Sequence, residues 1–223
     1  MSRVVLFDID NTLLYTGGAG SFAMNLAFNE MFGIPDGFAR VEFSGRTDLW
    51  ILQQGLTEHG IEGGLDKHFA ELTSRYYKLL PGTLREREGY LMPGFPQLLE
   101  SLRNAGVPLG LATGNFSEGA RIKLEYYGIA NYFSGGGFGE VSLDRSDVVA
   151  AAMRNVANGA RASDVLVVGD TPHDITSATA NGAIGVGVAT GKYTVEELRD
   201  SGAAMAYGDF ADWQRIATEW LAA

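Results

Sequence analysis

The sequence of 223 residues contains no cysteine and only three histidines, which are scattered at positions 59, 68 and 173. The lack of cysteine excludes disulfides, thiolate catalysis and cysteine-bound zinc. The scattered histidines argue against a zinc site built from imidazole ligands. Zinc chemistry is therefore not expected.

Positive charge is also scarce, since 17 lysines and arginines face 27 aspartates and glutamates, giving a formal net charge of −10. An acidic chain repels nucleic acid and anionic lipid, so neither is an expected partner. An anionic substrate would need a local cation or a metal ion. No apolar run reaches the roughly 18 residues of a membrane span, and no signal-peptide pattern opens the sequence. These features predict a cytoplasmic location.

Four short apolar runs without alternation are present, at residues 4–9, 107–112, 165–168 and 184–188. Such runs are typical of strands buried on both faces of a parallel sheet. Helical patterns separate or follow them, at residues 95–104, 117–127, 147–157, 174–180 and 210–221. The alternation of strand and helix predicts an α/β fold with a doubly wound parallel sheet.

The segment 16–88 interrupts this alternation and contains no convincing strand. Its helical patterns lie at residues 21–31, 47–58 and 65–80. We therefore expect an all-helical cap domain over residues 16–88, inserted into a core domain made of residues 1–15 and 89–223.

Two pairs of residues near the ends of this insertion, Gly17-Gly18 and Pro81-Gly82, are the expected hinges, because glycine tolerates large changes in φ and ψ. An apolar patch on the cap, or at Trp213 and Trp220, could support a dimer. The expected state is a monomer or a homodimer.

Carboxylates follow two of the predicted strands. Asp8 and Asp10 close the first run, and residues two apart in a strand project to the same side. Asp170 follows the third run, with Asp174 four residues later. Ligands of open α/β sheets bind beyond the carboxyl ends of the strands, and clustered carboxylates favour magnesium. For Asp174, an N-cap of the next helix is the simpler alternative.

The second predicted strand ends in Thr113, Gly114 and Asn115. The threonine hydroxyl can donate a hydrogen bond to a phosphoryl oxygen, and the glycine lets the backbone come close. Exposed N–H groups at the start of the following helix favour anions. A simple turn is the alternative.

Three patterns carry a resemblance to a known family: FDIDNTL at residues 7–13, ATGN at 112–115 and GDTPHD at 169–174. The sequence resembles the haloacid dehalogenase-like (HAD) hydrolase superfamily, and within it the phosphoglycolate-phosphatase-like branch with a helical cap. The resemblance covers nearly the whole chain. The first and last patterns, in this order and spacing, carry most of it.

One motif departs from the family. Where a lysine is usual, residues 143–147 read LDRSD, and we place Arg145 in the role of the lysine, balancing the charge of the nucleophile and the phosphate. Arginine is a planar fork rather than a compact point charge. A solvated arginine at a helix start is the alternative. Lys123 is a poorer candidate, because the helical pattern buries it.

The resemblance implies a Mg²⁺-dependent phosphatase. Asp8 would be the nucleophile that forms an aspartyl-phosphate, and Asp10 the general acid and base. Asp8, the backbone carbonyl of Asp10 and Asp170 would hold the metal, with Asp174 in support. The other phosphoryl-binding residues would be Thr113, Gly114, Asn115 and Arg145.

The substrate would be a small phosphorylated metabolite resembling phosphoglycolate. FSGRTD at residues 43–48 resembles a cap loop that meets the active site, which makes Arg46 a candidate for binding a second anionic group. A β-phosphoglucomutase-like phosphosugar mutase shares all these motifs and stays open. A haloacid dehalogenase is disfavoured, since those members usually lack an acid at Asp10. A non-catalytic module is disfavoured because the first aspartate and the metal ligands are intact.

Overall fold

The computed structural model describes residues 3–222. Residues 1, 2 and 223, at the ends of the predicted core domain, lie outside this part. A six-stranded sheet has the order β5-β4-β1-β6-β7-β8, and all its neighbouring strands are parallel. Its strands are β1 (Val4–Phe7), β4 (Leu109–Ala112), β5 (Gly136–Gly137), β6 (Val165–Gly169), β7 (Ile184–Val188) and β8 (Met205–Tyr207). The predicted fold class is confirmed.

Strand β1 lies inside the sheet because all four of its side chains are apolar and buried. Val5 and Phe7 belong to one apolar cluster, whereas Val4 and Leu6 belong to another on the opposite face. Alternate side chains of a strand point to opposite faces, so β1 needs cover on both. Phe7 pairs in register with Leu111 of β4 and Val168 of β6, which sets the ends of these three strands side by side.

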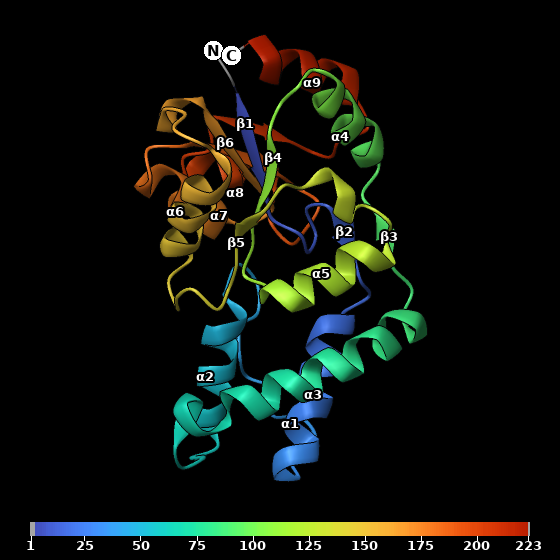
Figure 1. Cartoon of the computed structure of the whole chain (residues 1–223), viewed down its shortest axis with the longest axis vertical. Helices are drawn as coiled ribbons and strands as arrows, with labels where there is room; N and C mark the ends of the chain where they lie inside the picture. Colours follow the sequence, from blue (N-terminus) through green and yellow to red (C-terminus); the bar gives the residue numbers. More distant parts are fainter. Residues whose placement is uncertain (1–2, 223) are drawn as a thin grey trace.

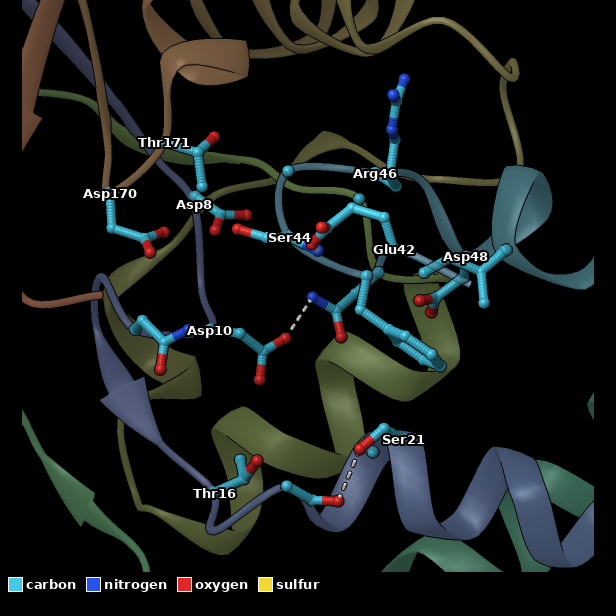
Figure 2. Close-up of a pocket in the computed structure, with 18 of the residues that line it drawn as sticks. Asp8, Asp10, Thr16, Ser21, Glu42, Ser44, Arg46, Asp48, Asp170 and Thr171 are labelled. Atoms are coloured by element: carbon cyan, nitrogen blue, oxygen red, sulfur yellow. Dashed lines mark hydrogen bonds between the residues drawn. The ribbon is translucent and has the colours of Figure 1, made fainter. Parts of the chain in front are cut away.

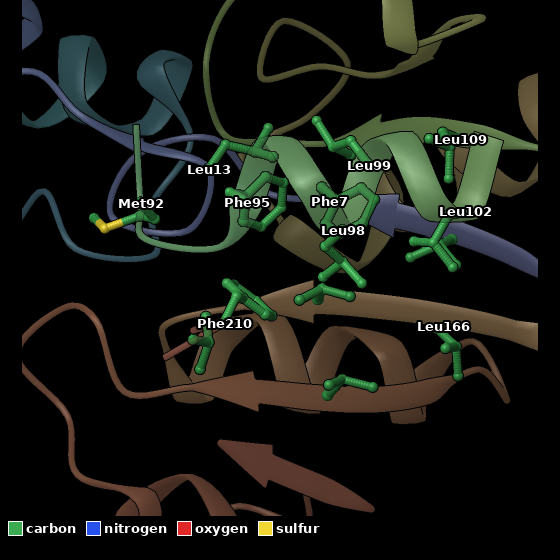
Figure 3. Packing of buried hydrophobic residues seen from close by; sticks show 14 of the residues in the cluster. Phe7, Leu13, Met92, Phe95, Leu98, Leu99, Leu102, Leu109, Leu166 and Phe210 are labelled. Carbon is green, nitrogen blue, oxygen red and sulfur yellow. The ribbon is translucent and has the colours of Figure 1, made fainter. Parts of the chain in front are cut away.

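Helices supply that cover (Figure 1). α4 and α9 pack on one face of the sheet, and α6 and α7 on the other. On the first face Phe7, Phe95 and Phe210 stack edge to face, with Phe7 and Phe95 ring centroids 5.3 Å apart (Figure 3). The helices of the core are α4 (Phe95–Asn104), α5 (Ser117–Tyr126), α6 (Arg145–Val156), α7 (Pro172–Ala180), α8 (Val195–Asp200) and α9 (Trp213–Ala222), with short 3-10 turns at Ala130–Tyr132 and Ala162–Asp164.

Trp220 of α9 is fully buried against Phe7 and Phe210. The expectation that it could form an exposed patch for a dimer is therefore wrong. The apolar face of α9 packs against the sheet, so its buried side chains cannot contact a second copy of the protein.

The inserted segment folds into three helices, α1 (Ala19–Phe32), α2 (Asp48–Glu58) and α3 (Gly64–Glu86), which lie beyond the carboxyl ends of the sheet strands (Figure 1). They share their own apolar cluster, to which Phe116 of the core contributes. A two-stranded antiparallel ribbon of β2 (Leu14–Tyr15) and β3 (Tyr90–Leu91) joins them to the core. No helix within residues 3–222 is long and apolar enough to cross a membrane.

The two expected hinges differ. Gly17 and Gly18, with φ of +63° and +76°, form the entry to α1, where a left-handed backbone favours glycine. The hinge expected at Pro81-Gly82 is wrong, because α3 runs through both residues. Proline usually breaks a helix interior, but Leu80 and Leu84 on either side are buried and hold this helix together.

Candidate active site

The ends of β1 and β6 bring Asp8, Asp170 and Asp174 together. One carboxylate oxygen from each lies within 4.8 Å of the others. The Asp8 N–H donates to the carbonyl oxygen of Val168 at 2.9 Å, which fixes the end of β1 against β6. Gly169 is needed beside them, since a Cβ there would come 2.1 Å from the carboxyl carbon of Asp174. Figure 2 shows Asp8 and Asp170 turned toward the same space.

The negative charge of this cluster is only partly balanced by Arg145. Burial, opposed by Arg145 and reinforced by Asp174 and Asp10, raises the pKa of Asp8 to about 6. Burial and the neighbouring carboxylates raise the pKa of Asp170 to about 9. A divalent ion would relieve both effects, and an all-oxygen donor set suits Mg²⁺. The residues present therefore fit a magnesium ion.

Arg145 lies inside this site and not in solvent. Its side chain is 6% exposed, and its Nη2 donates to Asp8 Oδ1 at 2.7 Å, to Asp174 Oδ1 at 2.7 Å and to the Ala112 carbonyl oxygen at 3.0 Å. The helix α6 that carries it begins where Asp144 accepts a hydrogen bond from the Ser146 N–H. The alternative of a solvated arginine is excluded by this burial.

The alternative that Asp174 is the N-cap of the next helix is wrong, because Thr171 is the N-cap of α7 and Asp174 is its third residue. Its Oδ2 accepts hydrogen bonds from the Thr171 N–H at 3.1 Å and the Thr171 hydroxyl at 2.8 Å, which closes a capping box at the start of α7. Its Oδ1 accepts from Arg145. Both oxygens thus have protein partners, so this carboxylate holds Thr171 and Arg145 in place.

The second strand end supplies the other side of the site. Thr113 is fully buried, and its hydroxyl oxygen accepts a hydrogen bond from Asn115 Nδ2 at 2.9 Å. Asn115 Nδ2 also donates to Asp10 Oδ2 at 2.8 Å. Thr113 therefore holds the Asn115 side chain in place without lining the cavity, whereas Gly114 and Asn115 line it.

Sequence reasoning set Lys123 aside, yet the structure brings it into the site. Its Nζ lies 2.6 Å from Asp10 Oδ2 and 2.6 Å from Asn115 Oδ1. A signal was available, since a lysine on the buried face of a helix is rare unless it is paired. The helix α5 starts at Ser117, two residues after the ATGN pattern at residues 112–115, and its Lys123 side chain reaches back to that pattern.

The cap loop contacts the same strand end. The Asp48 N–H donates to the Gly114 carbonyl oxygen at 2.7 Å, and Asp48 Oδ2 accepts from the Phe116 N–H at 2.9 Å. Burial, opposed by the charge of Lys123, raises the pKa of Asp48 to about 7. Sequence reasoning did not single out this carboxylate.

Arg46 lies in this loop and lines the cavity. Its guanidinium stacks on the Trp50 ring at 4.4 Å, and Figure 2 shows it pointing away from Asp8 and Asp10. Its proposed anion-binding role would require the side chain to turn.

A cavity of about 360 Å³ lies between core and cap. Asp8, Asp10 and Asp170 line its core side. The cap side is lined by a mixed set of polar and apolar residues that includes Ser21, Met24, Ile51 and Tyr76. A small organic phosphate fits a space of this size and polarity.

The comparisons with known proteins agree with this geometry. A family model described as haloacid dehalogenase-like hydrolase matches residues 2–182. A phosphoglycolate phosphatase of Rhodospirillum rubrum is 28% identical over 222 residues, covering 96% of this chain and 91% of the relative. Another, of Cereibacter sphaeroides, is 30% identical over 182 residues, covering 80% of this chain and 81% of the relative.

The fold also matches a solved structure, a hydrolase from Pseudomonas syringae, with a TM-score of 0.74 and 24% identity, covering 98% of this chain and 99% of that one. The chain belongs to the haloacid dehalogenase-like hydrolase family. Within that family it falls in the phosphoglycolate-phosphatase-like branch, and the expected enzyme class, a phosphatase, is confirmed.

Proposed function

We propose that the protein is a Mg²⁺-dependent phosphatase that hydrolyses a small, phosphoglycolate-like metabolite through an aspartyl-phosphate on Asp8. The observation that carries this proposal is the position of Asp8 in the cavity, between Arg145 and the Asp170 carboxylate. A carboxylate held beside a fixed cation and a metal-binding partner can attack phosphorus, whereas a lone buried carboxylate would be held neutral.

In the first step an Asp8 oxygen attacks phosphorus and the bond from phosphorus to the leaving oxygen breaks. Asp10, which lines the same cavity, gives its proton to that leaving oxygen. In the second step Asp10 takes a proton from water, the water oxygen attacks phosphorus, and Asp8 is released with inorganic phosphate. This exchange of roles needs one residue that serves as acid and then base.

Asp8, the Asp10 backbone carbonyl and Asp170 would hold Mg²⁺ with Asp174 in support, and Asp174 also holds Arg145 and Thr171 in place. When bound, the ion neutralises charge on the phosphoryl group. Gly114 and Asn115 would bind phosphoryl oxygens from the second strand end, with Thr113 fixing Asn115. Arg145 would bind the same oxygens from the opposite side.

The substrate class rests on the named relatives and on the size of the cavity. The phosphosugar mutase remains the second candidate, because its chemistry uses the same residues and passes the phosphate to a sugar. A cytoplasmic location and the choice between monomer and homodimer stay predictions from the sequence.

The test is a panel of metabolite phosphates that includes 2-phosphoglycolate, assayed with Mg²⁺ and with EDTA. Wild type should release phosphate only with Mg²⁺, and Asp8→Asn should be folded and inactive. Turnover by Asp8→Asn near the wild-type rate would refute the nucleophile. Activity that appears only with a phosphosugar, and only after a bisphosphorylated sugar is added, would favour the mutase.

A further inference from the structure

Two buried cations contact the carboxylates of the candidate site, and each contacts different ones. Arg145 contacts Asp8 and Asp174, whereas Lys123 contacts Asp10. The family resemblance calls for one such cation, and Arg145 takes that place. Lys123 therefore needs an explanation of its own.

We propose that Lys123 is a positioning residue that holds Asp10 and stabilises the charge this carboxylate acquires as it protonates the leaving group. The proposal rests on the role assigned to Asp10 under the proposed function. It gives α5 a part in the proton-transfer step.

The contacts of Lys123 fix where the Asp10 side chain can go. Its Nζ lies 2.6 Å from Asp10 Oδ2, and Asn115 Nδ2 reaches the same oxygen at 2.8 Å. Lys123 is tied in turn to Asn115 Oδ1 at 2.6 Å. Three side chains thus form a closed triangle, in which Lys123 and Asn115 both reach Oδ2 and leave the other Asp10 oxygen free of both partners.

Burial makes this ion pair costly to form and costly to break. The Lys123 side chain is 4% exposed, whereas that of Asp10 is 36% exposed. Desolvating an ammonium is costly unless it is paired, and Asp10 is its only ion-pair partner among residues 3–222. The pair is fully charged once Asp10 has given its proton to the leaving oxygen. Asp10 itself is open enough to be solvated, so its stability does not require a buried lysine.

The cap leaves room for this lysine. A Cβ added to Gly20 of α1 would lie 3.1 Å from Lys123 Nζ, tighter than an ordinary contact. The Tyr76 hydroxyl of α3 borders the same point, 3.7 Å from that Cβ position. The ammonium therefore lies between core and cap, and Lys123, Gly20 and Tyr76 all line the cavity.

The chemistry follows from the position. As the bond from phosphorus to the leaving oxygen breaks, its electron pair stays on that oxygen, which takes the proton of Asp10. Negative charge then develops on Asp10 beside the Lys123 ammonium, which keeps its own protons. A fixed cation aimed at charge that develops in the transition state lowers the barrier.

The loss of activity on replacing Lys123 should be larger for leaving groups that need a proton more. Phenyl, 4-nitrophenyl and 2,4-dinitrophenyl phosphate have leaving groups of similar shape, but the first needs a proton most and the last least. In Lys123→Met, kcat/KM should fall by about 30-fold for phenyl phosphate and by less than about 3-fold for 2,4-dinitrophenyl phosphate. Lys78→Met, on an exposed position of α3, is the matched control and should leave all three values unchanged.

Lys123→Gln keeps a polar tip without the charge and should show the same trend if Lys123→Met fails to fold. An equal loss on all three esters, or no loss on any, would overturn the role of Lys123 while leaving the proposed function intact. If wild type with Mg²⁺ released phosphate from none of these esters and from no member of the metabolite panel, the proposed function itself would fail, and this inference with it.

Discussion

A single nitrogen of Arg145 makes every hydrogen bond that ties this residue to Asp8 and its surroundings. Nη2 contacts Asp8, Asp174 and the Ala112 carbonyl, whereas the buried Nε has no hydrogen-bond partner within residues 3–222. The planar fork that distinguishes arginine from lysine is thus unused in these contacts. A lysine ammonium, which has three donors, could make the same three bonds.

Arg145→Lys should therefore keep kcat within about 10-fold of wild type, whereas Arg145→Met should lower kcat by about 100-fold or more, because an unpaired buried carboxylate pair remains. Steady-state kinetics on 4-nitrophenyl phosphate measures both. Arg154→Lys and Arg154→Met, on an exposed position of α6, control for general effects of the exchange. If Arg145→Lys were as inactive as Arg145→Met, the fork would matter after all.

Magnesium should stabilise the fold through the carboxylate cluster. The raised pKa values of Asp8 and Asp170 mark a site that gains from a bound cation. Adding millimolar Mg²⁺ should raise the unfolding midpoint of wild type, because a ligand that binds only the folded state stabilises it. Asp170→Asn should lose this increase and exposed Asp36→Asn should keep it. A full increase in Asp170→Asn would remove Asp170 from the metal site.

Arg46 provides a test of substrate charge. Because its guanidinium stacks on Trp50 at 4.4 Å, a second anion on the substrate must draw it away from that ring. Arg46→Ala should raise KM about 10-fold for 2-phosphoglycolate and less than about 3-fold for 4-nitrophenyl phosphate. Arg40→Ala, at a mostly exposed position, should change neither. Equal increases for both esters would rule out a selective role.

Asp48 should make stability depend on pH. Its pKa is raised from 3.8 to about 7, so the folded state binds a proton that the unfolded state has lost. This contribution to stability is fully present below pH 3.8 and is lost as pH rises through about 7. Between pH 5 and pH 8, wild type should lose about 2–3 kcal/mol of unfolding free energy relative to Asp48→Asn, because about two pH units lie between pH 5 and the folded-state pKa at about 1.4 kcal/mol each.

Denaturant unfolding of the two proteins at both pH values gives this difference, with Asp36→Asn as the exposed control. The test depends on the direction in which the unfolding free energy changes with pH. Wild type that gains stability relative to Asp48→Asn as pH rises would show that the Asp48 carboxylate is favoured as an anion in the folded protein.

Patterns in the sequence predicted the long elements well. The helix at Phe95–Asn104 and the strand at Ile184–Val188 begin and end as expected. The strand β5 was missed because it consists of Gly136 and Gly137, which carry no apolar signal. Glycine is required there by crowding, since a Cβ on Gly137 would lie 2.0 Å from the Val148 carbonyl oxygen. Such close approaches depend on the tertiary structure.

The candidate site divides in the same way. Asp8, Asp10 and Asp170 could be found because each follows a buried strand. Lys123 and Asp48 could not be placed by strand ends, since one reaches the site from two turns along a helix and the other from the cap. Their positions depend on how α5 and α2 pack, which the spacing of apolar residues does not report. The break expected at Pro81 failed for the same reason, because packing outweighed a local preference.

The two hydrogen bonds that Asp48 makes with Gly114 and Phe116 also affect how substrate enters the cavity and how product leaves it. They attach the cap directly to the loop proposed to hold phosphate, so lifting the cap would break both bonds and expose a carbonyl and an N–H of that loop to water. Any movement of the cap that admits substrate or releases phosphate would therefore also change the hydrogen bonding of this loop.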